Sequence, residues 1–209
     1  MDDFVSSALV TLLVTVDPPG LAPLFISLTH GMVAGERRQV ALRAVLIAFA
    51  VLTFFALGGG RILTLLGVGL PAFRIAGGFL LFWIAFEMVF EAPSERKAET
   101  ARRAITIDHI RNIAAFPLAI PLVAGPGAIT ATILLAGRAG SDPQLLVILV
   151  ALIGAVLALC ALVLLLAERI SQLLGATGNA VASRLLGVIL AALAVQFVID
   201  GARAAFVTG

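Results

Sequence analysis

The sequence predicts an all-α membrane protein with six transmembrane helices in two inverted three-helix repeats, the first and fourth helices being broken at Pro-Gly motifs. Three observations predict this fold class. Hydrophobic residues make up 61% of the 209 residues and charged residues only 12%, whereas soluble domains typically carry about 25% charge. Two Pro-Gly pairs interrupt long apolar runs, and short motifs recur between the two halves. We therefore expect residues 1–209 to form a single integral membrane domain.

Six apolar segments are long enough to cross a bilayer, because a helix needs roughly 20 apolar residues to span the hydrocarbon core. The expected crossings are Phe4–Thr29, Arg38–Gly60, Ala72–Phe90, Asn112–Gly137, Pro143–Ala167 and Arg184–Phe206. The first segment opens with Asp2 and Asp3 and contains no Lys or Arg, unlike the basic start of a signal peptide. We expect it to be retained as a crossing.

Two breaks interrupt the first and fourth segments, at Asp17-Pro18-Pro19-Gly20 and at Ala124-Gly125-Pro126-Gly127. Proline removes a helix hydrogen bond. Lipid offers no partner to an unwound backbone, so a break is tolerated only where the freed groups face protein, water or a ligand. Counted from Phe4 and from Asn112, each break lies roughly 20 Å in from its own face at 1.5 Å per residue. The breaks are therefore expected to meet at a cavity near the midplane.

The two halves resemble each other at a slowly increasing offset. Pro19-Gly20 matches Pro126-Gly127 at 107 residues, Leu65-Leu66-Gly67 matches Leu173-Leu174-Gly175 at 108, and Arg74-Ile75-Ala76-Gly77 matches Arg184-Leu185-Leu186-Gly187 at 110. We interpret this as a duplication, with a first repeat at 1–91 and a second at 112–209; chance similarity among Leu, Ala and Gly is the alternative. Three crossings per half invert the second repeat, the arrangement in which substrate sites form at the midplane from discontinuous helices.

Basic residues divide ten to four between the two membrane faces when six crossings are assumed. The positive-inside rule puts the larger set in the cytoplasm and both termini outside. If each broken segment instead returned as a re-entrant hairpin, Arg138 and Arg203 would exchange sides with Arg169 and Arg184, and the division would be the same. The 26 residues of Phe4–Thr29, about 39 Å as a helix, favour a broken crossing.

The rest of the chain shows no sign of catalysis or of a bound metal. Residues 92–111 form a charged linker whose mixed signs suit a solvated cytoplasmic connection. His30 and His109 have no second metal ligand at helical spacing, and the single Cys160 excludes an internal disulfide. Enzyme motifs such as a P-loop or HExxH are absent from the sequence. We expect no enzyme activity, no cofactor and no metal, and the net charge of +2 gives no support for nucleic-acid binding.

The breaks suggest a way to hold a small charged solute. After each Pro-Gly pair a new helix begins, and its first amides carry a partial positive charge that attracts an anion such as a carboxylate. The preceding half-helix ends in free carbonyls, which suit an ammonium group, Na⁺ or a proton donor. Asp17 adds a carboxylate at a depth where ionisable groups are costly and commonly functional. The alternative is that Asp17 caps the helix through the amides of Gly20 or Leu21. Both roles are compatible.

Three further polar residues are candidates for the same cavity. Thr15 and Thr130 could offer hydroxyls, although Thr also commonly bonds to its own helix backbone. Gln196 is an amide deep in the last helix, and an interhelical hydrogen bond is the alternative for it. Gly187, Ala191 and Ala194 form a small-residue stripe on another face of that helix, which predicts close helix packing.

Two long motifs are similar to those of the MarC family of multi-pass membrane proteins, also called the neutral amino acid transporter family. The first runs from Asp17 to Phe25 and the second from Pro121 to Thr130; Arg184 to Gly187, with Gln196 and Gly201, resembles the family's last helix. The first position is Asp where Asn is also seen in relatives. The resemblance implies six crossings in two inverted halves, as in the wider lysine-exporter superfamily. It also implies transport of small neutral amino acids such as glycine and alanine.

The expected function is that of a secondary transporter of small neutral amino acids, coupled to H⁺ or Na⁺, in the cell inner (plasma) membrane. It would work by alternating access to a midplane site. The expected substrate-binding residues are Asp17, Pro19, Gly20, Gly125, Pro126, Gly127, Thr130 and Gln196, with Asp17 and Thr15 for the coupling ion. A channel or exporter for another small solute and a non-transporting membrane scaffold are the alternatives. Assembly as a homo-oligomer stays open.

Overall fold

The computed structural model describes residues 2–30, 32–90, 113–140 and 142–207, and these ranges are helical apart from short connections. The helices are α1 Asp2–Val16, α2 Pro18–Leu28, α3 Ala34–Leu65, α4 Leu70–Val89, η1 Ala114–Val123, α6 Pro126–Ala139, α7 Pro143–Leu165 and α8 Ala167–Val207. No strand occurs within these ranges. The expected linker at 92–111, with His109, lies outside the described residues.

Apolar length makes this an integral membrane protein. Within the part of the chain that the structure describes, five helical spans are long and apolar enough to cross a membrane: Asp2–Leu28, Ala34–Leu65, Leu70–Val89, Pro143–Leu165 and Ala180–Phe206. The bent pair of η1 and α6 would add a sixth if it counts as one span. The all-helical class predicted from composition is confirmed. Large apolar side chains such as Phe79, Phe54 and Val147 are more than half exposed, as expected where lipid is the solvent.

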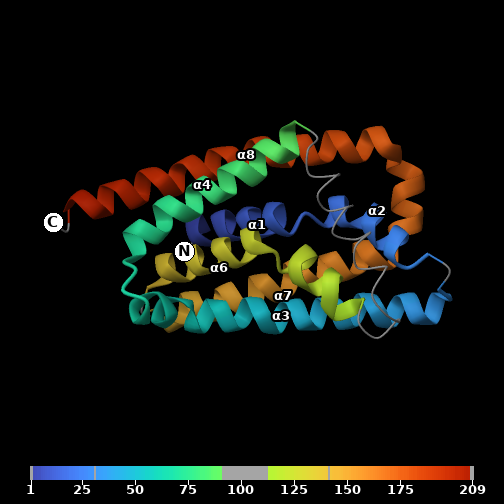
Figure 1. The fold of residues 1–209 in the computed structure, drawn as a ribbon, viewed down its shortest axis with the longest axis horizontal. Coiled ribbons are helices and arrows are strands. Elements are labelled where there is room, and N and C mark those ends of the chain that lie inside the picture. The colour runs from blue at the N-terminus through green and yellow to red at the C-terminus, as the bar shows by residue number, and fades with distance from the viewer. Residues whose placement is uncertain (1, 31, 91–112, 141, 208–209) are drawn as a thin grey trace.

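The helices lie in three tiers (Figure 1). Helix α4 runs along α8 on one side, α3 runs along α7 on the other, and α1 and α6 lie between them. Helices α1 and α2 follow each other in one direction along the long axis, whereas η1 and α6 follow each other in the opposite direction. Both interrupted segments therefore lie in the core, each surrounded by other helices.

Small residues bring α4 and α8 into close contact. A Cβ added to Gly78 would lie 2.8 Å from the carbonyl oxygen of Ala194, and one added to Gly187 would lie 3.1 Å from that of Ala85. Glycine is required at such points because the backbones approach too closely for a side chain. The predicted packing role of the small-residue stripe is confirmed for Gly187 and Ala194.

Helix ends follow local sequence signals, and two helices extend beyond their expected segments. The carboxylate of Asp142 accepts a hydrogen bond of 2.8 Å from the Gln144 amide and caps α7. Gly67 adopts a positive φ of 69° just beyond the end of α3.

Helix α3 begins at Ala34, before the expected Arg38. Helix α8 begins at Ala167, well before the expected Arg184, because no proline interrupts the segment between them.

Candidate functional site

The first break is a single left-handed residue. Asp17 has φ 50° and ψ 61°, its side chain is only 4% exposed, and its Oδ1 accepts a hydrogen bond of 3.2 Å from the Gly20 amide. The capping role considered for Asp17 is thus confirmed. A Cβ on Gly20 would lie 2.1 Å from Oδ2 of Asp17, so glycine is needed for the carboxylate to reach the amide.

The same break leaves carbonyl groups at the end of α1 without their usual helical donors. Pro18 and Pro19 have no N–H to give to the carbonyls of Val14 and Thr15, four residues earlier. The Gly20 amide bonds to the Asp17 side chain. A buried carboxylate and the partial negative charge of a helix C-terminus therefore lie together here, a combination that favours a cation.

The second break differs from the first. Segment η1 contains wide turns in which the amides of Leu118 and Ala124 donate to carbonyls five residues earlier, at Ile113 and Ala119. Phe116 and Ile120, before Pro117 and Pro121, have extended backbone angles. A helical segment precedes this break, as expected, but it is irregular, because two prolines spaced by four residues remove successive helical donors.

Helix α6 starts directly after this break, bent by 58° from η1. Its N-cap is Gly125, which has no side chain to bond the first amides, and Pro126 occupies the first turn. Of the two helices that begin at the breaks, α2 is capped by a carboxylate and α6 has no side-chain cap. The amides of Gly127 and Ala128 are thus the stronger attraction for an anion.

Both breaks are partly covered by neighbouring helices in this conformation. Ala124 is fully buried, and a Cβ on Gly127 would lie 2.7 Å from Ile84 and 3.7 Å from Leu81, both on α4. On the other side, Cys160 of α7 is close enough to Asp17 to interact with it electrostatically. Aliphatic side chains thus cover Gly127, whereas Pro126 is exposed and Pro19 and Gly20 are partly exposed.

The three other candidate residues lie in different surroundings. The Thr15 hydroxyl donates to the carbonyls of Thr11 and Leu12 at 2.8 and 3.2 Å, within its own helix. Thr130 is buried on α6, with its methyl group towards Gly77 of α4. Gln196 is exposed, and its amide donates to Asp200 at 2.7 Å. The structure thus brings Thr130 near the start of α6 and places Gln196 in a separate polar cluster.

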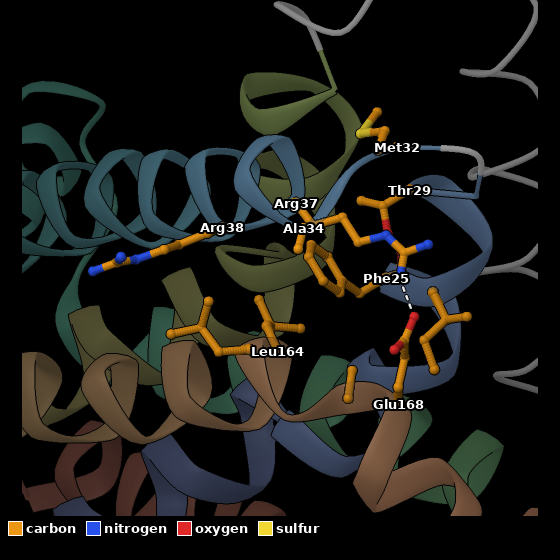
Figure 2. Close-up of a pocket in the computed structure, with 11 residues that line it drawn as sticks. Phe25, Thr29, Met32, Ala34, Arg37, Arg38, Leu164 and Glu168 are labelled. Carbon is orange, nitrogen blue, oxygen red and sulfur yellow. Dashed lines mark hydrogen bonds and ion pairs between the residues drawn. The ribbon is translucent and has the colours of Figure 1, made fainter.

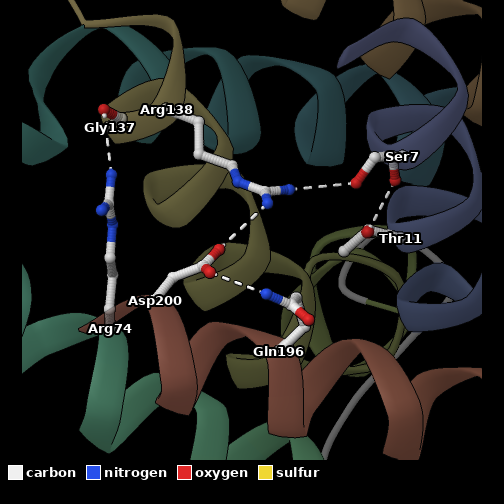
Figure 3. Close-up of polar contacts among 7 residues, drawn as sticks. All are labelled: Ser7, Thr11, Arg74, Gly137, Arg138, Gln196 and Asp200. Atoms are coloured by element: carbon white, nitrogen blue, oxygen red, sulfur yellow. Dashed lines mark hydrogen bonds and ion pairs between the residues drawn. The ribbon is translucent and has the colours of Figure 1, made fainter. Parts of the chain in front are cut away.

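That cluster joins three helices around Arg138 (Figure 3). The guanidinium donates to Oγ of Ser7 on α1 and to the carboxylate of Asp200 on α8, each at 3.1 Å. It also lies 5.3 Å above the ring of Phe197. The sequence pointed to Gln196 but gave no sign that Arg138 would join this cluster, because Arg138 is 62 residues from Asp200.

A pocket of about 330 Å³ lies at the opposite end of the molecule, and sequence analysis missed it (Figure 2). It is bounded by the end of α2, the start of α3 and the junction of α7 with α8. Arg37 of α3 and Glu168 of α8 form an ion pair across it. The sequence shows only that Arg37 and Glu168 are charged residues near the ends of apolar segments. It does not indicate that these two residues, 131 apart in sequence, will meet. Within the described ranges no group of three or more His, Cys, Asp or Glu could hold a metal.

Comparison with known proteins gives a family for the whole chain. The model of the MarC family, described as integral membrane proteins, matches residues 2–206. An Archaeoglobus fulgidus membrane protein is 40% identical to this chain, and the match covers 95% of this chain and 92% of the length of that protein. The membrane protein YhcE of Escherichia coli is 36% identical over 91% and 88%, and YvbG of Bacillus subtilis is 33% identical over 99% and 97%. No solved structure matches.

Proposed function

Because the chain belongs to the MarC family of integral membrane proteins, we propose that it is a secondary transporter of small neutral amino acids of the glycine and alanine class. It would be coupled to H⁺ or Na⁺ in the inner (plasma) membrane. The observation that carries this proposal is the pair of buried helix breaks with complementary charge. One presents the Asp17 carboxylate and free carbonyls, and the other presents the amides at the start of α6.

The proposed architecture is six crossings in two inverted repeats, and reciprocal helix contacts support it. If α1, α2, α3 and α4 correspond to η1, α6, α7 and α8, most of the contacts between the two halves have a counterpart. Helix α2 contacts α8 as α6 contacts α4, and α1 contacts α7 as η1 contacts α3. The corresponding helices α3 and α7, and α4 and α8, also pair with each other. Such reciprocity is expected of a pseudo-two-fold axis.

Two polar contacts support broken crossings against re-entrant hairpins. With two hairpins, Arg37 and Glu168 would lie on opposite faces of the membrane, and so would Arg74 and Gly137. Yet Arg37 is paired with Glu168, and Arg74 donates to the Gly137 carbonyl at 3.4 Å. Both contacts are compatible with six crossings.

In the proposed mechanism the two breaks hold opposite ends of a zwitterion. The amides of Gly127 and Ala128 take the carboxylate, which the Asp17 carboxylate repels from the start of α2. Asp17 and the adjoining carbonyls take the ammonium group or the coupling ion. Thr15, whose hydroxyl is bonded within its own helix, contributes to the ion site through its carbonyl.

Alternating access needs contacts that close each end in turn, and two polar clusters are suited to this. Arg37 and Glu168 join the first half to the second at one end. Arg138 joins Ser7 of the first half to Asp200 of the second at the other end. Both ion pairs are partly exposed to solvent. Partly exposed ion pairs contribute little net stability, so opening either end would cost little.

The aliphatic packing around Gly127 favours a second candidate function, a non-transporting membrane scaffold in which the breaks are permanent kinks. Uptake experiments separate the two. Purified protein in proteoliposomes should take up labelled glycine or alanine with saturation and counterflow, and uptake should depend on a Na⁺ or pH gradient. No uptake of any neutral amino acid under either gradient would favour the scaffold, whereas ohmic current without counterflow would indicate a channel.

The role of Asp17 can be tested within the same assay. Asp17→Asn keeps a capping oxygen, and Asn caps helices about as well as Asp, so folding should be preserved while the charge is lost. We expect uptake to be abolished or its ion dependence altered. Asp142→Asn, the same change at the exposed cap of α7, is the control and should leave uptake unchanged. Wild-type uptake and coupling in Asp17→Asn would exclude the carboxylate from the mechanism.

A further inference from the structure

The pocket between Arg37 and Glu168 has the form of a ligand site distinct from the helix breaks. Its wall combines apolar side chains from α2 and α7, including Phe25, Ile26 and Leu164, with the charged pair and the Thr29 side chain. Figure 2 shows Arg37 and Glu168 extending from opposite walls and meeting across the space. A volume of about 330 Å³ is at the small end of the range for organic ligands, roughly 300–1,000 Å³.

The ion pair does not use the full bonding capacity of the guanidinium. Arginine has five N–H donors in a planar fork, and the Nε of Arg37 is buried with no hydrogen-bond partner among the described residues. The Glu168 side chain is 63% exposed and that of Arg37 27% exposed. Ion pairs that solvent reaches contribute little to stability, so a ligand with its own charges can replace either partner.

We propose that this pocket is an entry site for the charged groups of a small amino acid, with Arg37 binding the carboxylate and Glu168 binding the ammonium group. The inference rests on the proposed transport function and adds a second, peripheral binding position to it. Arginine binds carboxylates through two parallel hydrogen bonds, and the unused Nε of Arg37 is part of that fork. The apolar wall then faces the amino acid side chain.

The charge balance of the pocket favours a zwitterion over an anionic lipid headgroup. A phosphate at Arg37 would face the carboxylate of Glu168, which the ion pair holds directly beside it. The neighbouring Arg38, which could have strengthened an anion site, extends away from the pair along α3 (Figure 2). Although Arg38 also lines the pocket, the two charges held side by side are one positive and one negative, which matches one carboxylate and one ammonium.

The pocket also lies close to the first break along α2. Phe25 is eight residues beyond Asp17 on the chain, about 12 Å along the axis of α2. Leu164 is one helical turn from Cys160 on α7, and Cys160 interacts electrostatically with Asp17. An amino acid released from the pocket would therefore need to travel little more than two helical turns to reach the buried carboxylate. By the positive-inside rule this entry faces the cytoplasm.

Binding of three related probes to the purified full-length chain in detergent tests the assignment. Alanine carries both charges, N-acetylalanine lacks the ammonium group, and alaninamide lacks the carboxylate. Glu168→Gln should weaken alanine binding about tenfold or more and leave N-acetylalanine unchanged, because hydrogen bonds to charged groups are strong enough for that change. Arg37→Gln should weaken alanine and N-acetylalanine equally and leave alaninamide unchanged.

Matched controls distinguish the site from a general charge effect. Arg43→Gln, at an exposed position on the same helix, and Asp3→Asn, at an exposed position of α1, should bind all three probes as the wild type does. Glu168→Asp keeps the carboxylate and should bind alanine more tightly than Glu168→Gln does, if Glu168→Gln has lost the binding site and not the fold. Circular dichroism of each variant verifies that it is folded.

The possible results separate this inference from the proposed function. If the wild type takes up alanine in proteoliposomes but both glutamine variants keep wild-type affinities for every probe, the pocket assignment alone is wrong. An equal loss of affinity for all three probes would indicate that the ion pair only holds the helices together, and would also overturn the pocket assignment. Stabilisation by anionic phosphatidylglycerol that requires Arg37, without any effect of alanine, would assign the pocket to lipid. A wild type that neither binds nor transports amino acids would overturn both proposals.

Discussion

The contact between Asp17 and Gly20 allows a quantitative prediction for the first helix break. Removing the cap in Asp17→Ala should cost about 1 kcal/mol. In Gly20→Ala the new Cβ would lie 2.1 Å from Oδ2 of Asp17, so the side chain must move. Overpacking of this kind costs about 2 kcal/mol, partly offset by the roughly 1 kcal/mol by which Ala exceeds Gly in helix propensity. Each single variant should therefore lose about 1 kcal/mol of unfolding free energy.

The double variant should be close to wild-type stability. With the carboxylate absent, the Cβ at position 20 meets no obstacle from it, so the cap loss of about 1 kcal/mol and the propensity gain of about 1 kcal/mol nearly cancel. The double-mutant cycle formed by the wild type, the two single variants and the double variant therefore predicts an interaction free energy of about 2 kcal/mol between positions 17 and 20. Reversible unfolding in mixed detergent and dodecyl sulfate, followed by circular dichroism, measures all four proteins. Additive losses, with the double variant least stable, would show that the carboxylate does not lie over Gly20.

Two further predictions concern helix packing and the outer polar cluster. Gly78→Ala should destabilise by about 1–3 kcal/mol, because its Cβ would lie 2.8 Å from the Ala194 carbonyl oxygen. Gly58→Ala, with nothing within 4 Å of its Cβ, should instead gain up to about 1 kcal/mol; equal thermal midpoints for the two variants would contradict the close α4–α8 contact. Arg138→Gln and Asp200→Asn should each change the apparent affinity for substrate on one side of the membrane only, and the double variant should resemble either single one. Uptake assays in vesicles of known orientation measure the affinity on each side of the membrane. Fully additive effects of the two substitutions would show that the Arg138–Asp200 ion pair does not act as a unit.

Helix positions were predictable because each depends on local composition. Apolar runs of the necessary length located the spans, and Pro-Gly pairs located both breaks to within a residue or two of Asp17 and Gly125. The small-residue stripe predicted the face of α8 that packs on α4, since close backbone approach requires Gly or Ala. The extent of α8 was underestimated, because the residues before Arg184 are too polar to read as a span yet contain no proline to end the helix.

Contacts between distant residues were not predictable from one sequence. Arg37 meets Glu168 and Arg138 meets Asp200 only because the helices place them at common ends of the bundle. Gln196 was expected near the breaks for its depth, but an aspartate one turn away provides a nearer partner. The wide turns of η1 result from Pro117 and Pro121 acting together, whereas each proline alone would predict only a kink.

The inequality of the two breaks is what gives the proposed site a direction. Two identical inverted repeats would place equal charges at both helix starts, and a zwitterion could bind in either orientation. Asp17 fills the start of α2 with a carboxylate, whereas Ala124, its counterpart in the proposed repeat, provides no carboxylate and the start of α6 has no side-chain cap. A substrate carboxylate is repelled from the first and attracted to the second, so its amino group must point towards Asp17. In the proposed mechanism the same carboxylate would hold the coupling ion when the amino group is absent, and one residue would then couple ion and substrate movement.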